Sequence, residues 1–297
     1  MIAPPFLTAG DTIYLTAPAK AIEESTVYAA KETIESWGLS VEIAEHCLGR
    51  DHYFSGTDQE RLTDFQKGLD TPEFAAILCA RGGYGCVRLI EHLSWDLFRQ
   101  HPKWVIGFSD VTLLHQKIQQ EGFQSIHGIM PLGFTSGSES ALSSLKNALF
   151  GKPFAVTGPE HPLNQLGECS GGLIGGNMTL VYSQLGTSLC CDFRDKILFL
   201  EDVGEHLYKI DRMLYALRMA GAFHKIKGLI LGGFTDMEDT DVPFGKTLEE
   251  LVVEQVSNLN IPVAFGFPAG HIDDNQALIL GKSVRLTVTE QGSSLFI

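Results

Sequence analysis

The first half of the chain alternates short apolar runs with longer amphipathic stretches, as strands alternate with helices. The short runs are apolar at successive positions, which is typical of parallel strands buried on both faces. This pattern predicts an α/β fold whose sheet is mostly parallel. The expected strands cover residues 12–17, 41–44, 74–80, 104–108 and 124–126, and the expected helices cover residues 23–37, 58–69, 86–92 and a stretch after 108.

The composition of the chain changes between residues 131 and 172, where glycine, proline, serine and threonine are frequent around one helical stretch, residues 141–149. Beyond it, glycine-punctuated strands and a few helices predict a smaller α/β domain with a mixed sheet. We therefore expect an N-terminal domain over residues 1–150, a linker over 151–170 and a C-terminal domain over 171–297. In that domain we expect strands over residues 172–175, 197–201, 228–234, 262–267, 277–280 and 284–288, and helices over 177–185, 206–219 and 248–259.

Composition narrows the class of protein. Of the 297 residues, 44% are hydrophobic and 20% are charged, which favours a packed globular chain over a disordered one. The net charge of −14, without any basic cluster, argues against nucleic acid or an anionic membrane as a partner. No stretch is apolar for long enough to span a bilayer.

The six cysteines include no Cys-x-x-Cys pair, and several lie within apolar runs, as buried thiols do. We expect neither a zinc site nor a disulfide framework. We also expect the protein to work in a reducing compartment. The first residues show neither a basic segment nor a long apolar one, so we expect a cytoplasmic protein.

The segment around Ser109 carries the strongest chemical signal. An apolar run ends in Gly107-Phe108-Ser109-Asp110 and turns at once into a helical pattern. A serine on such a turn exposes its hydroxyl, and the amides of the following helix can stabilise an oxyanion beside it. The same sequence also fits a simple helix N-cap, and it lacks the second glycine of Gly-x-Ser-x-Gly.

A serine nucleophile needs a histidine base and an acceptor that orients the base. His115 follows Ser109 too closely on one helix to face it, whereas His127 and His206 remain candidates. His271 follows an apolar strand and the small-residue turn Phe267-Pro268-Ala269-Gly270, a placement that suits a histidine reaching into a cleft. Spacing alone fits a surface-loop histidine equally well.

Glu201 ends the apolar run 197–200, so its carboxylate is either desolvated or paired. It can orient a histidine, or it can form a structural ion pair, for example with Arg212. Periodicity does not choose between the two.

Glycine-rich turns and acidic clusters add two further alternatives. The turns at residues 81–85 and 171–177 can donate amides to an oxyanion or a phosphate, but neither matches a phosphate-binding loop or a dinucleotide fingerprint. Acidic residues and histidines at 201–206 and 271–274 can in principle hold a divalent metal. No His-Glu-x-x-His is present, and we expect no metal.

Six ordered segments resemble the LD-carboxypeptidase family of serine peptidases, which includes muramoyltetrapeptide carboxypeptidases and microcin C7 self-immunity proteins. They are residues 16–19, 81–85, 107–110, 171–177, 200–202 and 266–271. The resemblance implies a catalytic triad of Ser109, Glu201 and His271. It also implies an oxyanion hole made by the backbone amides of Gly83 and Asp110.

The resemblance further implies an N-terminal domain like that of class I glutamine amidotransferases, a swivelling β/β/α C-terminal domain and a homodimer. We expect a serine carboxypeptidase, without metal or cofactor, that removes D-alanine from a murein tetrapeptide in cell-wall recycling. Arg81 is a candidate partner for the terminal carboxylate. Two alternatives stay open: a microcin C7-type hydrolase that cleaves a peptidyl-nucleotide toxin, and a binding module without catalysis.

Overall fold

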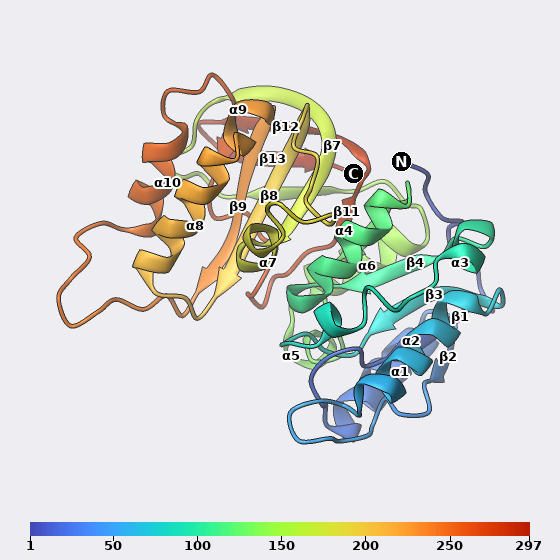
Figure 1. Cartoon of the computed structure of the whole chain (residues 1–297). Helices are drawn as coiled ribbons and strands as arrows, with labels where there is room; N and C mark the ends of the chain where they lie inside the picture. Colours follow the sequence, from blue (N-terminus) through green and yellow to red (C-terminus); the bar gives the residue numbers. More distant parts are fainter. The chain divides into compact units, whose positions relative to one another are not determined.

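The computed structural model describes residues 1–297 and divides them into two compact units, each with its own sheet (Figure 1). Unit 1 comprises Met1–Pro153 and Asp273–Leu280, and unit 2 comprises Phe154–Ile272 and Gly281–Ile297. The expected linker, residues 151–170, contains a strand of unit 2. The segment Asp273–Leu280, which we expected in the C-terminal domain, contributes a strand to unit 1.

The six-stranded sheet of unit 1 has the order β11-β5-β4-β3-β1-β2. All neighbours are parallel except β11, which pairs antiparallel with β5 at the edge. Apart from the edge strand β2, which exposes Ser40 and Glu42, the strands are almost entirely buried, as their apolar runs predict. Their bounds are β1 Thr12–Thr16, β2 Ser40–Ile43, β3 Phe74–Cys79, β4 Trp104–Gly107, β5 Ser125–His127 and β11 Leu278–Leu280.

Six α-helices accompany this sheet: α1 Glu24–Ser36, α2 Asp58–Asp70, α3 Asp96–Gln100, α4 Thr112–Gln120, α5 Gly133–Ser136 and α6 Glu139–Leu149. Thr57 and Glu60 form a capping box at the start of α2, which satisfies the first amides of that helix. The helix expected up to residue 92 is wrong. Only the 3₁₀ turn η1, Cys86–Arg88, forms there. Arg88 N and Leu89 N donate to carbonyls three residues back, and the one bond that spans four residues, from Ile90 N to Cys86 O, is not continued into a helix.

The seven-stranded sheet of unit 2 is mixed, as expected, with the order β10-β9-β8-β7-β12-β13-β6. The first four strands are parallel and the remaining pairs are antiparallel. The strand bounds are β6 Ala155–Gly158, β7 Gly167–Asn177, β8 Lys196–Val203, β9 Gly228–Thr235, β10 Val263–Ala264, β12 Ser283–Thr289 and β13 Gly292–Phe296.

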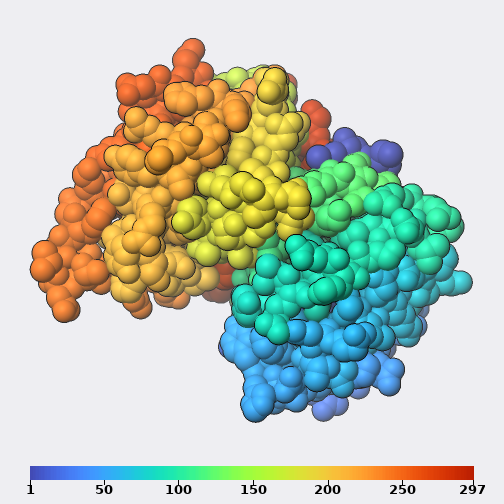
Figure 2. All heavy atoms as spheres, viewed as in Figure 1, coloured from blue at the N-terminus to red at the C-terminus, as the bar shows by residue number.

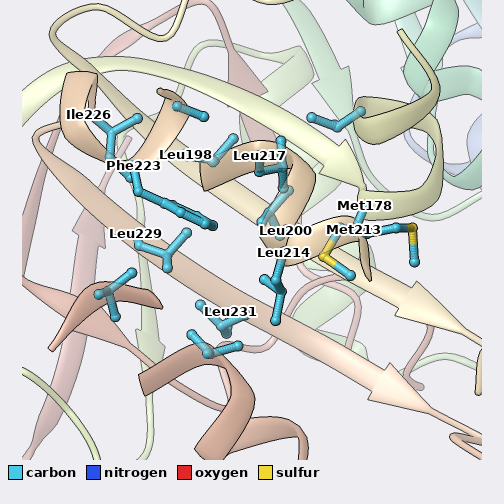
Figure 3. Packing of buried hydrophobic residues seen from close by; sticks show 14 of the residues in the cluster. Met178, Leu198, Leu200, Met213, Leu214, Leu217, Phe223, Ile226, Leu229 and Leu231 are labelled. Atoms are coloured by element: carbon cyan, nitrogen blue, oxygen red, sulfur yellow. The ribbon is translucent and has the colours of Figure 1, made fainter. Parts of the chain in front are cut away.

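The helices of unit 2 are α7 Met178–Ser183, α8 Leu207–Met219, α9 Ala222–Lys225 and α10 Leu248–Val256. They pack on its parallel strands over an apolar core. Figure 3 shows side chains of β8 and β9 meeting those of α8 and α9, with Leu200 and Leu231 close to Leu214. Burying a side chain of this kind contributes about 1.5–3 kcal/mol, so this packing fixes β8 and β9 firmly.

Residues 236–246, between β9 and α10, form a mostly exposed segment that projects from unit 2 (Figure 2). No helix in the structure combines the length and the apolar character needed to cross a bilayer.

Candidate active site

The Ser109 turn joins β4 to the 3₁₀ turn η2, Ser109–Val111, which leads directly into α4. Ser109 has φ +61°, in the left-handed region that residues other than glycine seldom occupy. Such strain, at the carboxyl end of a parallel strand and just before a helix, is typical of a turn that exposes a nucleophile. The turn is thus more than an ordinary helix N-cap, whose backbone is extended.

The turn after β3 passes against Ser109. A methyl group placed on Gly82 would lie 2.8 Å from Cβ and 3.0 Å from Oγ of Ser109, so only glycine fits here. The same point is 3.3 Å from the amide nitrogen of Asp110. The glycine-rich turn and the start of η2 are therefore in direct contact.

Two amides at this contact are available as donors. The amide of Gly83 donates no hydrogen bond within the chain. The first backbone hydrogen bond of η2 runs from Val111 N to Phe108 O. The amide of Asp110 lies one residue before Val111, and no carbonyl in the turn accepts a hydrogen bond from it. Unpaired amide donors beside a serine hydroxyl can stabilise an oxyanion.

The carboxylate of Asp110 is buried and accepts a hydrogen bond from the amide of Cys86 at 2.7 Å. Burial raises its pKa, although the bond from Cys86 and the charge of Arg61 oppose that rise. This contact ties the residue after Ser109 to the end of the glycine-rich turn.

In unit 2, Glu201 and His271 form a pair. Nδ1 of His271 lies 2.5 Å from Oε2 of Glu201, and the backbone amide of His271 donates to the same oxygen at 3.2 Å. Glu201 is fully buried in β8, whereas 18% of the His271 side chain is exposed. The structure therefore pairs Glu201 with a histidine and not with Arg212, whose guanidinium lies over the Tyr208 ring.

Close approach of backbone makes this pair possible. Gly270 has φ +111°, and a Cβ there would lie 2.7 Å from Cβ of Glu201. The loop is also held by β9, because Gly233 N donates to Ala269 O at 2.8 Å and Thr235 Oγ1 donates to His271 O at 3.0 Å. The imidazole is consequently held from its own backbone and from two strands.

The electrostatics of the pair favour a charged imidazole. Burial disfavours the imidazolium of His271, but the hydrogen bond and charge of Glu201 and the charge of Asp202 outweigh it, so the pKa of His271 is raised. Burial raises the pKa of Glu201 against the hydrogen bonds from His271. With Nδ1 donating to Glu201, the neutral ring carries its basic lone pair on Nε2.

Asp202 supports the same strand end. Its buried carboxylate accepts hydrogen bonds from Asn177 Nδ2 at 2.8 Å, from Thr179 N and Oγ1 at 2.9 Å each, and from Val203 N at 2.9 Å. Burial raises its pKa. Asp202 therefore fastens the start of α7 to the end of β8, beside Glu201.

The other candidate histidines have different surroundings. His115 is fully buried between Ser125 Oγ and Gly107 O, and burial lowers its pKa to about 4, so it is a neutral structural residue. His127 is buried at the end of β5, 5.7 Å from the Phe108 ring. His206 pairs with Glu238 at 3.3 Å.

Arg81 is half-buried and donates one hydrogen bond, to Ala21 O at 3.4 Å, while no carboxylate of the chain pairs with it. No group of three or more His, Cys, Asp or Glu side chains is placed to hold a metal ion. The acidic side chains pair with single partners instead: Glu201 with His271, and Glu205 with Lys209.

Sequence reasoning missed the contact of Gly82 with Ser109 and the anchoring role of Thr235. A glycine pair after a strand signals close backbone approach, but it does not say to which residue. The hydroxyl of Thr235 leaves no signal at all in the sequence. A strained serine and a buried carboxylate–histidine pair are the parts from which serine hydrolases are built.

Comparison with known proteins agrees with that class. The profile of the LD-carboxypeptidase N-terminal domain matches residues 13–128, and that of the LD-carboxypeptidase C-terminal domain matches residues 170–286. The chain belongs to the LD-carboxypeptidase family, whose members are serine peptidases, as the sequence predicted. It is 32% identical over 288 residues to the murein tetrapeptide carboxypeptidase of Pseudomonas aeruginosa, covering 92% of each chain.

Solved structures confirm the α/β fold. The muramoyltetrapeptide carboxypeptidase from Oxalobacter formigenes superposes with a TM-score of 0.88 at 28% identity, over 96% of this chain and 98% of that one. The microcin C7 self-immunity protein MccF in complex with aspartyl sulfamoyl adenosine gives 0.86 at 21% identity, over 100% of this chain and 99% of that one. The second likeness concerns the fold alone.

Proposed function

We propose that Ser109, His271 and Glu201 form one catalytic triad and that the enzyme is a cytoplasmic L,D-carboxypeptidase acting on murein tetrapeptide. The reaction releases the terminal D-alanine and serves cell-wall recycling. The observation that carries the proposal is the buried Glu201 carboxylate bonded to Nδ1 and to the amide of His271. This arrangement fixes the tautomer whose Nε2 can accept a proton.

In the first step, Nε2 of His271 takes the proton of Ser109 as Oγ attacks the carbonyl carbon before D-alanine. The amides of Gly83 and Asp110 donate to the resulting oxyanion. The carbon–nitrogen bond then breaks, and the imidazolium gives its proton to the leaving amine. Glu201 stabilises the imidazolium through both stages.

In the second step, water attacks the ester between the tripeptide and Ser109. His271 takes a proton from that water and returns it to Oγ as the tripeptide leaves. The residues account for every proton transfer, so the mechanism requires no metal and no cofactor.

Arg81 is proposed to bind the terminal carboxylate of the substrate. Its guanidinium has no carboxylate partner in the chain, and it directly precedes Gly82, which touches Ser109. A planar guanidinium suits bidentate recognition of a carboxylate. We therefore expect the recognition group to lie next to the contact with the nucleophile.

Two relatives suggest the compounds to test: one is a murein tetrapeptide carboxypeptidase, and the other was solved in complex with aspartyl sulfamoyl adenosine. The wild-type protein is incubated with L-Ala-γ-D-Glu-meso-diaminopimelate-D-Ala and, separately, with aspartyl sulfamoyl adenosine, with Ser109→Ala as the control. We expect D-alanine release by the wild type only. Cleavage of the sulfamoyl compound without D-alanine release would replace the murein assignment by the microcin C7-type alternative.

The fold likeness to MccF is the observation that favours this alternative. Against it, residues 131–172 offer only Phe134, Phe150 and Phe154 as aromatic side chains, and no tryptophan, to stack on a nucleobase. A binding module without catalysis would cleave neither compound. The proposed homodimer is checked by light scattering of the purified protein, for which we expect twice the chain mass of 32.5 kDa.

A further inference from the structure

Arg61 is a buried cation within unit 1, and it lies on α2 rather than on the strands that carry the candidate site. Its side chain has no exposed surface. The guanidinium donates from Nε to Gly56 O at 3.2 Å, and from Nη1 to Pro18 O at 2.6 Å and Gly85 O at 3.3 Å. One side chain thus joins three loops, including the glycine-rich turn.

The contact with Gly85 continues to the nucleophile. The carbonyl of Gly85 and the amide of Cys86 belong to the same peptide group. Arg61 holds that group by its carbonyl, and the carboxylate of Asp110 holds it by its amide at 2.7 Å. Since Asp110 directly follows Ser109, a continuous chain of polar contacts runs from Arg61 to the serine turn.

A guanidinium is well suited to this place. Its rigid fork presents several donors in fixed directions, whereas a lysine ammonium is a single point on a flexible stem. Its charge is balanced by an ion pair with Asp58, and its Cζ lies 4.5 Å from the centroid of the Phe54 ring. Gly85 must be glycine, because a Cβ there would lie 2.7 Å from Nη1 of Arg61.

We propose that Arg61 is a positioning residue, which acts with the carboxylate of Asp110 through the Gly85–Cys86 peptide to hold the glycine-rich turn against Ser109. Its task is to fix the amide of Gly83 where the oxyanion forms. The inference rests on the proposed function, because it presupposes that Ser109 is the nucleophile. A purely structural role would lower only the stability of the protein. The proposed positioning role predicts that replacing Arg61 lowers the rate of the chemical step.

The test measures kcat and KM for D-alanine release in Arg61→Ala, Arg61→Lys and the wild type, normalised to correctly folded protein. We expect kcat to fall about 10²-fold, as for a misplaced or missing oxyanion donor, with KM within about threefold. Methylguanidinium added to Arg61→Ala should restore part of kcat, and Arg61→Lys should stay impaired. The control is Arg88→Gln, because the Arg88 side chain also pairs with Asp58 but is exposed and donates to none of the three backbone carbonyls that Arg61 holds.

A second readout does not depend on the substrate. The rate at which a fluorophosphonate labels Ser109 should fall in Arg61→Ala by a similar factor and recover with methylguanidinium. An unchanged kcat and labelling rate in folded Arg61→Ala, with only a lower Tm, would overturn the inference while the wild-type activity stands. A wild type that neither releases D-alanine nor becomes labelled would overturn the proposed function, and this inference with it.

Discussion

Oε2 of Glu201 accepts two hydrogen bonds from His271, one from the ring at 2.5 Å and one from the backbone amide at 3.2 Å. Two donors from a single residue fix both the tautomer and the plane of the imidazole before a substrate arrives. A base held in this way loses little orientational freedom during the reaction. This arrangement and the contact of Ser109 with the glycine-rich turn can be tested separately.

Replacing Glu201 by glutamine should change both the rate and its pH dependence. The neutral form of His271 is the active base, so kcat/KM rises as pH increases through the pKa of His271. Glu201 and Asp202 hold that pKa above the ordinary value of about 6.5, against the effect of burial. Without the Glu201 charge, burial dominates, the pKa falls, and the rising limb of the profile moves to lower pH.

We expect this shift together with a loss of roughly 10³–10⁴ in kcat, because the glutamine amide can hold the wrong tautomer. The measurement is a profile of kcat/KM against pH. Glu205→Gln is the matched control, since Glu205 pairs with Lys209 and not with the imidazole. If the rising limb of the pH profile did not move in Glu201→Gln, the carboxylate would not set the charge of His271.

Gly82→Ala should impair the chemistry more than the fold. The added methyl would lie 2.8 Å from Cβ and 3.0 Å from Oγ of Ser109, so the serine or the turn must move. A displacement of about 1 Å costs on the order of 10² in rate. Gly128→Ala serves as the control, because its methyl would meet ordinary contacts at 3.5 Å or longer. Equal kcat values for the two variants would exclude a tight contact at Ser109.

Gly270→Ala should separate the Glu201–His271 pair. The methyl would lie 2.7 Å from Cβ of Glu201, and φ is +111°. Gly245→Ala controls for backbone strain alone, since φ there is +85° and nothing lies within 4 Å. We expect Gly245→Ala to cost about 1–2 kcal/mol of unfolding free energy and to keep its activity.

For Gly270→Ala we expect a further cost of about 1–3 kcal/mol from overpacking, and loss of most of kcat. Chemical denaturation and D-alanine release measure the two effects. If both variants lost the same stability and kept the same activity, the close approach of Gly270 to Glu201 would have no role.

Most strands could be predicted from the sequence because they are buried on both faces. The runs that became β1, β3, β4, β8 and β9 are apolar at nearly every position, so their hydrophobic pattern is strong. The strand β13 was missed, because Gly292-Ser293-Ser294 carries little apolar signal. The run that became β11 was found, but its pattern does not say which sheet it joins, and it pairs with β5 of unit 1.

The site could be predicted only as a set of alternatives. The turn at Ser109 is local, so the sequence shows it, whereas Glu201 and His271 are 70 residues apart and meet only in the folded unit. Spacing left three histidines open, and only the folded unit shows that His271 is the one bonded to Glu201. The role of Arg61 was invisible, because an arginine on an amphipathic helix is usually a solvated residue.

If Ser109 and the Glu201–His271 pair act in one reaction, removal of the imidazole must slow the attack by Ser109. The decisive measurement is the rate at which a fluorophosphonate labels Ser109 in the wild type and in His271→Ala, with labelling at Ser109 confirmed by peptide mass mapping. We expect loss of the base to slow labelling roughly 10²–10⁴-fold without unfolding unit 1. Equal labelling rates in the two proteins would contradict it.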